Sequence, residues 1–181
     1  MKKTVSLLMA VLLCLVFASA ALADTFGLGI VTGIGSSKDA TVVDGTAKDG
    51  VAQVDSCICA VILGDDGVIK AISFDVAQTK VTFSGAGVIT ADKTAEVMSK
   101  VELGDKYNMA RVATAGEWYQ QAAAFEAYCI GKTVEEMLAT PVYARDANHT
   151  TVADVADLKT TCTIDIGEFL EALEKAAANA K

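Results

Sequence analysis

The sequence predicts a single α+β domain, an antiparallel sheet with helices packed on one face. The first observation is that segments before Thr90 alternate apolar and polar residues with a period of two, as strands do. The second is that the period changes to about 3.6 after Thr90, as in helices. The third is size, because 181 residues that are 52% hydrophobic suit one core, and no repeat or linker divides residues 24–181.

The strands are expected in the first half of the chain. The run FGLGIVTGI alternates apolar residues with glycine, and VIKAISFDV alternates again after the turn sequence GDDG at 64–67. The second and third strands should therefore form a hairpin, and the segments after it should extend an antiparallel sheet. The expected strands cover residues 26–34, 51–63, 68–76, 79–83 and 87–90.

Two helices are expected between Thr90 and Gly131. Asp92 can cap a first helix that ends near Gly104. Thr114 and Glu117 have the spacing of a capping box, and a longer helix should follow them. Its apolar stripe should face the sheet and consists of Trp118, Ala122, Phe125 and Cys129.

Two more helices are expected near the C-terminus. Thr133 and Glu136 repeat the capping-box spacing before a short helix that stops ahead of Pro141. The polar stretch 143–158 is expected to be a long loop. Asp165 and Glu168 should open the last helix, whose apolar face holds Ile166, Phe169, Leu170 and Leu173.

Residues 1–23 have the pattern of a secretory signal peptide. Lys2 and Lys3 precede an apolar stretch at 7–17 that is too short to span a bilayer, and Ala21-Leu22-Ala23 has the small-x-small cleavage pattern. The mature chain should begin at Asp24 and act outside the cytoplasm, in the periplasm, the cell envelope or the extracellular space. Later segments are too short and too polar for a transmembrane helix, so none is expected.

The charge balance argues against nucleic acid as a partner. The chain has 15 Lys and Arg against 23 Asp and Glu, a formal net charge of −8. Binding a phosphate backbone needs clustered cations, which this composition does not favour. We therefore expect no nucleic-acid partner.

The cysteines left after signal cleavage allow three interpretations. They are Cys57, Cys59, Cys129 and Cys162. Cys57 and Cys59 point to the same face of an expected strand and are poorly placed to pair with each other. The set could be buried small hydrophobic residues, or two disulfides from the strand pair to the later cysteines. A metal site is the third reading, although C-x-C without a second close pair is not structural-zinc spacing.

Most catalytic constellations are absent from the sequence. The single histidine, His149, lies in a polar stretch without a nucleophile motif nearby. The triplet GKT at 131–133 resembles the end of a phosphate-binding loop, but Glu126 stands where that loop needs glycine. The residues alone do not decide whether the chain is an enzyme.

One stretch carries a family resemblance. The sequence DLKTTCTID, from Asp157 to Asp165, is followed by an amphipathic helix and resembles the D-x-x-[ST]-G-A-T-x-[ST] signature of the FMN-binding domain family. The run GDDGVIKAISFDVAQT also resembles that family's D-G-x-I strand pair, whose following loop lines the flavin. In the family, the threonine that corresponds to Thr163 can be esterified to the FMN phosphate.

The resemblance implies an exported FMN-binding protein that carries electrons in the cell envelope, with a redox protein as partner. The implied flavin-contacting residues are Asp157, Thr160, Thr161 and Thr163. Thr161 and Cys162 replace the family's glycine and alanine, and Asp165 replaces its second hydroxyl. Because a carboxylate there repels phosphate and competes for the same N–H groups, Asp165 disfavours covalent attachment. The alternative function is a non-catalytic envelope or extracellular protein that keeps the fold without flavin and binds a partner or itself.

Overall fold

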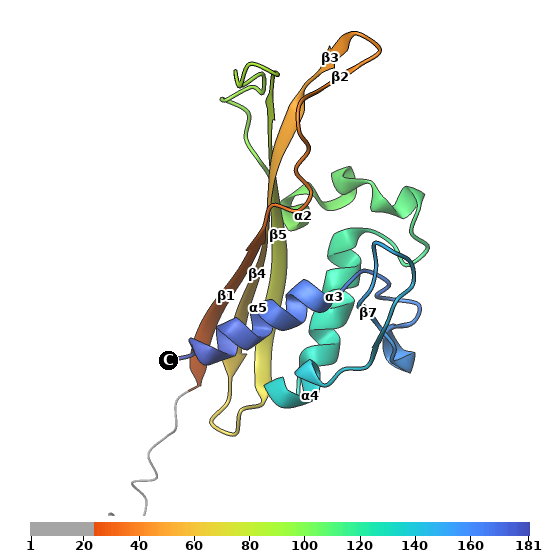
Figure 1. Cartoon of the computed structure of the whole chain (residues 1–181). Helices are drawn as coiled ribbons and strands as arrows, with labels where there is room; N and C mark the ends of the chain where they lie inside the picture. Colours follow the sequence, from red (N-terminus) through yellow and green to blue (C-terminus); the bar gives the residue numbers. More distant parts are fainter. Residues whose placement is uncertain (1–23) are drawn as a thin grey trace, which may run out of the picture.

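A computed structural model describes residues 24–181, and the predicted signal peptide at 1–23 lies outside the described residues. Its centre is a three-stranded antiparallel sheet in the order β1-β4-β5 (Figure 1). The strands are β1 (Thr25–Gly33), β4 (Gly50–Leu63) and β5 (Ile69–Phe83). Helices α3 and α5 pack on one face of this sheet, which confirms the α+β prediction.

The period-two pattern of the strands separates a buried face from an open one. Cys57 and Cys59 on β4 and Phe74 on β5 are fully buried beneath the helices. On the opposite face, Phe26 and Leu28 of β1 are 56% and 46% exposed. The two faces follow from alternating side-chain direction along each strand.

Glycine on the buried face of β1 lets helix α5 lie directly on the strand. A Cβ added to Gly29 would lie 2.0 Å from the Ala172 carbonyl oxygen, and one on Gly27 equally close to that of Ala176. The Gly/apolar alternation that predicted a strand therefore also marks a helix-contact face.

The predicted third and fourth strands are one continuous strand, β5. Its 15 residues pair with β4 along almost their whole length. The predicted strand at 87–90 is wrong, because after a turn the chain makes only an isolated bridge between Phe83 and Ile89. A small hairpin absent from the prediction, β2 (Thr41–Val43) with β3 (Thr46–Lys48), turns through Asp44 and Gly45, both at positive φ.

The helix predicted to begin at Asp92 is much shorter. Asp92 accepts hydrogen bonds from the backbone N–H and the hydroxyl of Thr94, so it closes a local turn. Helix α2 (Lys100–Leu103) begins only after Ser99, which forms a capping box with Glu102. Two single-turn 3₁₀ helices follow, η1 (Gly104–Tyr107) and η2 (Met109–Arg111).

The two central helices follow the predictions closely. Helix α3 (Trp118–Cys129) buries the predicted stripe against the sheet, although its N-cap is Glu117, paired with Gln120, and not Thr114. Helix α4 (Val134–Leu138) has the predicted capping box between Thr133 and Glu136.

The C-terminal third contains more structure than predicted. The expected loop includes η3 (Ala156–Leu158) and a pair of two-residue strands, β6 (Val142–Tyr143) and β7 (Val152–Ala153). Helix α5 (Gly167–Ala178) has the predicted apolar face, with Phe169 and Leu173 buried. The predicted capping box of Asp165 and Glu168 is wrong, because the N-cap of α5 is Ile166, whose side chain forms no capping hydrogen bond. Asp165 accepts from the Gly167 N–H at 2.9 Å from just before the helix.

The core is aromatic at its centre and lined by thiols. Phe74 stacks on Phe169 with ring centroids 4.5 Å apart, and Phe125 lies 5.8 Å from each of these rings. The four cysteines within residues 24–181 are buried and unpaired. Burial raises the pKa to about 12 for the thiols at 57, 59 and 129 and to about 11 for the thiol at 162.

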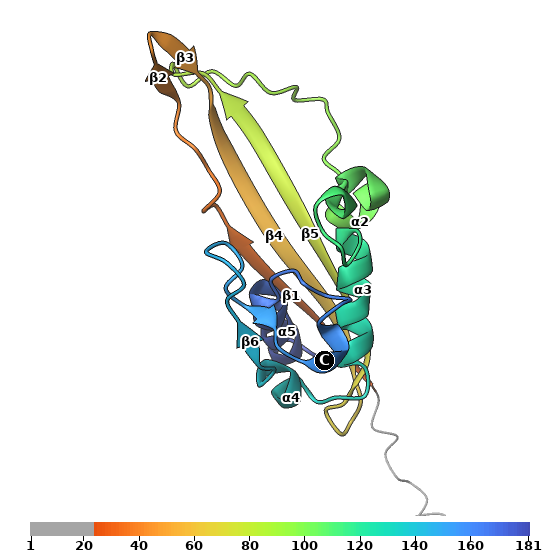
Figure 2. The same cartoon turned by 90° about the vertical axis from the view of Figure 1, so that its right-hand side faces the viewer.

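The outer ends of β4 and β5 extend beyond the helices (Figure 2). We call residues 34–54 and 79–98, which include the β2–β3 hairpin, the distal arm. Local contacts hold the arm together: Lys38 bridges to Val51 through two backbone hydrogen bonds. Within residues 24–181, the helices are too short or too polar to cross a bilayer.

Candidate functional site

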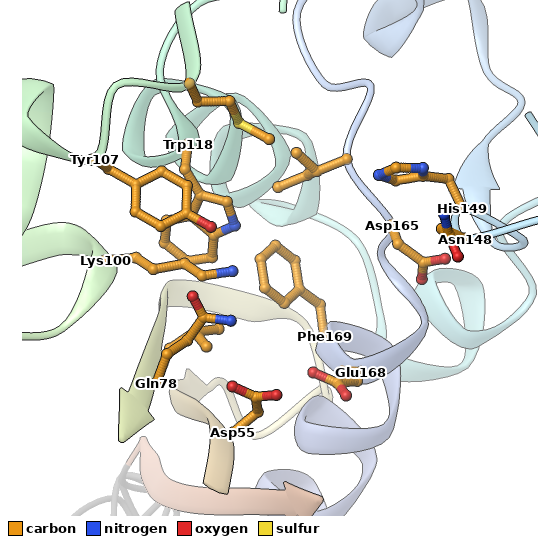
Figure 3. A pocket seen from close by; sticks show the side chains of 13 residues that line it. Asp55, Gln78, Lys100, Tyr107, Trp118, Asn148, His149, Asp165, Glu168 and Phe169 are labelled. Carbon is orange, nitrogen blue, oxygen red and sulfur yellow. The ribbon is translucent and has the colours of Figure 1, made fainter. Parts of the chain in front are cut away.

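A cavity of about 440 Å³ lies where the strands emerge from under the helices (Figure 3). We call it the main cavity. Its walls come from β4 and β5, from the α2–η2 segment, from α3, from the 148–149 loop and from the start of α5. The lining side chains are Asp55, Val76, Gln78, Lys100, Tyr107, Met109, Trp118, Asn148, His149, Ile164, Asp165, Glu168 and Phe169.

Two core aromatic rings form a rigid wall of the main cavity. Trp118 and Phe169 are 4% and 3% exposed, and their rings meet edge to face at 5.8 Å. Their positions follow from the buried stripe of α3 and the apolar face of α5. The wall is therefore pre-formed, as expected of a small-molecule site.

Lys100 places a positive charge in the main cavity. Its Nζ lies 5.1 Å from the Trp118 ring centroid and 5.2 Å from that of Tyr107, within cation–π range. Burial lowers the pKa of Lys100, an effect that the nearby carboxylates of Asp55 and Glu168 oppose. Within residues 24–181, no carboxylate oxygen lies within the 4 Å of a salt bridge to this ammonium.

The carboxylates of the main cavity differ in how they are held. Asp55 accepts two hydrogen bonds from the Gln53 amide, at 2.8 and 2.9 Å. Burial, together with the charge of Asp55, raises the pKa of Glu168. Burial alone would raise the pKa of Asp165 too, but hydrogen bonds from Thr151, Gly167 and Thr150 outweigh it and lower that pKa.

Several hydrogen-bond donors face the main cavity without a protein partner. In the described part of the chain, the Gln78 amide, the Tyr107 hydroxyl, the Trp118 indole N–H and the Lys100 ammonium make no hydrogen bond to another protein group. Donors left free at a cavity wall are available to a ligand. The arrangement suits a flat ring with acceptor atoms at its edge.

A second cavity, of about 350 Å³, lies next to the main one and shares Met109, His149 and Ile164 with it. Arg145 lines it and donates from Nη1 to the Thr163 carbonyl oxygen at 2.7 Å and from Nε to Asp146 at 3.1 Å. His149 Nδ1 lies 2.7 Å from the Asp146 carboxylate. That contact, with a bond from the Asn148 N–H, lowers the pKa of Asp146 to about 2.

Of the four residues that the sequence singled out, only Thr163 lines one of these two cavities. Its backbone N–H and its hydroxyl lie 2.9 and 3.1 Å from Oε1 of the fully buried Gln121, which accepts from both. Asp157, Thr160 and Thr161 lie exposed on η3 and the turn after it, where the Thr161 hydroxyl donates to the Asp157 carbonyl oxygen. These three do not line the main or the second cavity.

Sequence reasoning missed most of the cavity residues. Lys100 belongs to the segment predicted as a helix from Asp92 to near Gly104, and the Ser99–Glu102 capping box was the available signal for the true helix start. Tyr107 lies beyond that predicted helix, at the end of η1. Arg145 lay in the predicted loop without a motif. Trp118 and Phe169 were predicted correctly as core residues, but their second role as a cavity wall depends on tertiary structure.

Comparisons with known proteins found no relative of this chain. A scan against protein-family models, a search of curated proteins and a search of solved structures each found no match. The geometry and chemistry of the two cavities are therefore the basis for a functional proposal.

Proposed function

We propose that this chain is an exported FMN-binding protein that carries electrons outside the cytoplasm. The observation that carries the proposal is the pairing of two adjacent cavities, one with aromatic walls and unpaired donors, the other with Arg145 beside Thr163. FMN has the matching parts, a flat ring with acceptor atoms and a phosphate on a short chain. When bound, FMN supplies the redox chemistry, and the protein supplies binding, orientation and electrostatics.

The main cavity has the properties that a flavin ring needs. Its volume falls within the range of about 300–1,000 Å³ typical of small-molecule sites. The almost fully buried Trp118 and Phe169 close one side of the cavity with apolar atoms, while Lys100 and Gln78 offer donors to the carbonyl edge of the flavin ring. The rigid wall also excludes water from one side of the ring.

The second cavity supports the phosphate end. Arg145 is paired with Asp146 through Nε, but within residues 24–181 its Nη2 donates to no protein group and can form the charge-assisted bond that arginine makes with phosphate. The N-terminus of α5 is a poorer phosphate site, because Asp165 already accepts from the Gly167, Thr150 and Thr151 N–H groups. Since the Thr163 hydroxyl donates to buried Gln121, we propose non-covalent binding.

The proposal is tested by measuring the binding of FMN and of riboflavin to variants of two arginines. Equilibrium dialysis should show FMN retained by the wild-type protein with a Kd in the micromolar range. Arg145→Gln should weaken FMN binding about tenfold or more, but should leave binding of riboflavin, which lacks the phosphate, nearly unchanged. Arg111→Gln is the matched control, because Arg111 is exposed and lines neither cavity.

Two results would overturn the proposal. The first is no retention of FMN by the wild type at tens of micromolar. The second is an equal loss of FMN and riboflavin binding in Arg145→Gln, which would place the phosphate elsewhere. Intact mass after co-expression with a flavin-transferring enzyme checks the mode of attachment: an adduct of FMN less water, lost in Thr163→Val, would show that attachment is covalent.

A second candidate function is self-association without flavin, favoured by the open face of the sheet. Phe26, Leu28 and Ile30 on β1 are 56%, 46% and 49% exposed and lie beside Ala60 and Ile62 of β4. The edge of β1 is already blocked, since Asn179 donates to the Leu28 carbonyl oxygen at 3.3 Å, so a second copy would have to stack on the face. Light scattering that shows a dimer, dissociated by Leu28→Glu, would support this candidate; a monomer would exclude it.

A further inference from the structure

We infer that Lys100 and Glu168 shift the reduction potential of a flavin bound in the main cavity in opposite directions, Lys100 upward and Glu168 downward. This inference rests on the proposed FMN binding. It adds what that proposal leaves open, namely which residues of this chain control the electron affinity of the site.

The two side chains enter the main cavity from different walls. Lys100 extends from α2 across the faces of Tyr107 and Trp118, and Glu168 extends from the first turn of α5 (Figure 3). They do not neutralise each other by contact, because salt bridges within residues 24–181 do not join them. Their charges still interact at a distance, because each is among the groups that shift the pKa of the other, and both act on whatever fills the space between them.

The sign of each effect follows from the charge that reduction adds. Uptake of two electrons and one proton from a reductant leaves the flavin with one more negative charge than before. A nearby ammonium stabilises this added charge, and a nearby carboxylate destabilises it. The effect of Lys100 is the better shielded of the two, because Lys100 is partly buried against the aromatic wall whereas Glu168 is exposed to solvent that screens its charge.

Lys132 provides a matched control for Lys100. Its Nζ also lies over a tyrosine ring, 3.6 Å from the Tyr128 centroid, and it donates to the Tyr128 carbonyl oxygen. It lines neither the main nor the second cavity. Lys132→Met therefore removes a lysine from a tyrosine face without changing the charge in the site.

The experiment measures the Kd of oxidised FMN and of dithionite-reduced FMN for each variant. Lys100→Met should lower the preference for the reduced form at least tenfold, which corresponds to a fall of about 30 mV in midpoint potential for a two-electron couple. Glu168→Gln should raise that preference, Lys100→Arg should stay near the wild type, and Lys132→Met should leave the ratio unchanged. Circular dichroism checks that every variant is folded.

The possible outcomes distinguish failure of this inference from failure of the proposed FMN binding. If the wild type retains neither form of FMN, both fail. If the wild type retains FMN but Lys100→Met and Glu168→Gln change the two Kd values by the same factor, the residues only shape the cavity and this inference alone is overturned. This inference is also overturned if Lys100→Met and Glu168→Gln shift the ratio of the two Kd values in the same direction.

Discussion

The two ends of the long strands β4 and β5 show what the helices contribute to this molecule. At the proximal end, helices α3 and α5 bury one face of the sheet, and Cys57, Cys59 and Phe74 are fully inaccessible. In the distal arm, hydrogen bonding between the strands continues, but Val42 and Val88 are 72% and 62% exposed. Strand pairing alone therefore extends the sheet, whereas helix packing builds the core.

The main cavity lies where the helix-covered part of the sheet meets the distal arm. Asp55 and Gln78 are paired residues on the buried face, one step beyond the apolar pair Cys57 and Val76. At that point the face changes from apolar to polar, and the helices no longer cover it. A cavity with one rigid apolar wall and one polar wall results, which is the composition expected of a ligand site.

The largest expected effect is the loss of an aromatic ring from the proximal core. Phe125→Ala should lower the free energy of unfolding by about 3–5 kcal/mol, because the fully buried ring leaves a cavity between Phe74 and Phe169. Phe83 in the distal arm is only half-buried, so Phe83→Ala should lower the free energy of unfolding by less than half as much. Urea unfolding measures both; equal costs would contradict the contrast between the two regions.

A methyl group added under α5 should have the next largest effect. Gly29→Ala would place a Cβ 2.0 Å from the Ala172 carbonyl oxygen, and because that atom is backbone, the helix must move. The expected cost is about 1–3 kcal/mol. Gly33→Ala, at the boundary end of the same strand, meets nothing within 4 Å and should be nearly neutral. Thermal unfolding measures both variants. Equal melting temperatures for Gly29→Ala and Gly33→Ala would show that α5 does not pack on β1 as described.

A smaller effect, confined to acid pH, is expected at the edge of the main cavity. The pKa of Asp165 is lowered in the folded state, so its contribution to stability is present above the unfolded pKa and is lost as pH falls through the folded pKa. Asp165→Asn should flatten the loss of stability below about pH 4. Asp157→Asn, an exposed carboxylate on η3, is the control. An unchanged acid unfolding curve for Asp165→Asn would show that its hydrogen bonds contribute nothing.

The proximal half was largely predictable because its signals are local. The stripe from Trp118 to Cys129 and the Thr133–Glu136 capping box each lie within a few helical turns, and both are found as expected. The antiparallel hairpin of β4 and β5 was likewise marked by its GDDG turn. In these places local propensity, apolar pattern and tertiary contact agree.

The main cavity was not predictable in the same way. Asp55, Lys100 and Glu168 come from three distant segments, and their meeting depends on how far the strands extend past the helices. The predicted helix from Asp92 failed because Asp92 and Ser99 both have N-cap chemistry, and the weaker apolar period between them gave no means of choosing. The resemblance in the 157–165 segment led to Thr163, which lines the second cavity, and to three residues that line neither the main nor the second cavity.

The smallest effect is expected in the distal arm. Val42→Thr changes a residue that is 72% exposed, so unfolding by urea should shift by no more than about 0.5 kcal/mol. Amide hydrogen exchange compares the two ends of β4 directly. Backbone N–H groups near Cys59 should exchange only when the whole protein unfolds, and those near Ala52 should exchange through local opening. If Val42→Thr instead cost as much as a core substitution, the arm would have to be buried in solution, and the contrast between a packed half and an open arm would fail.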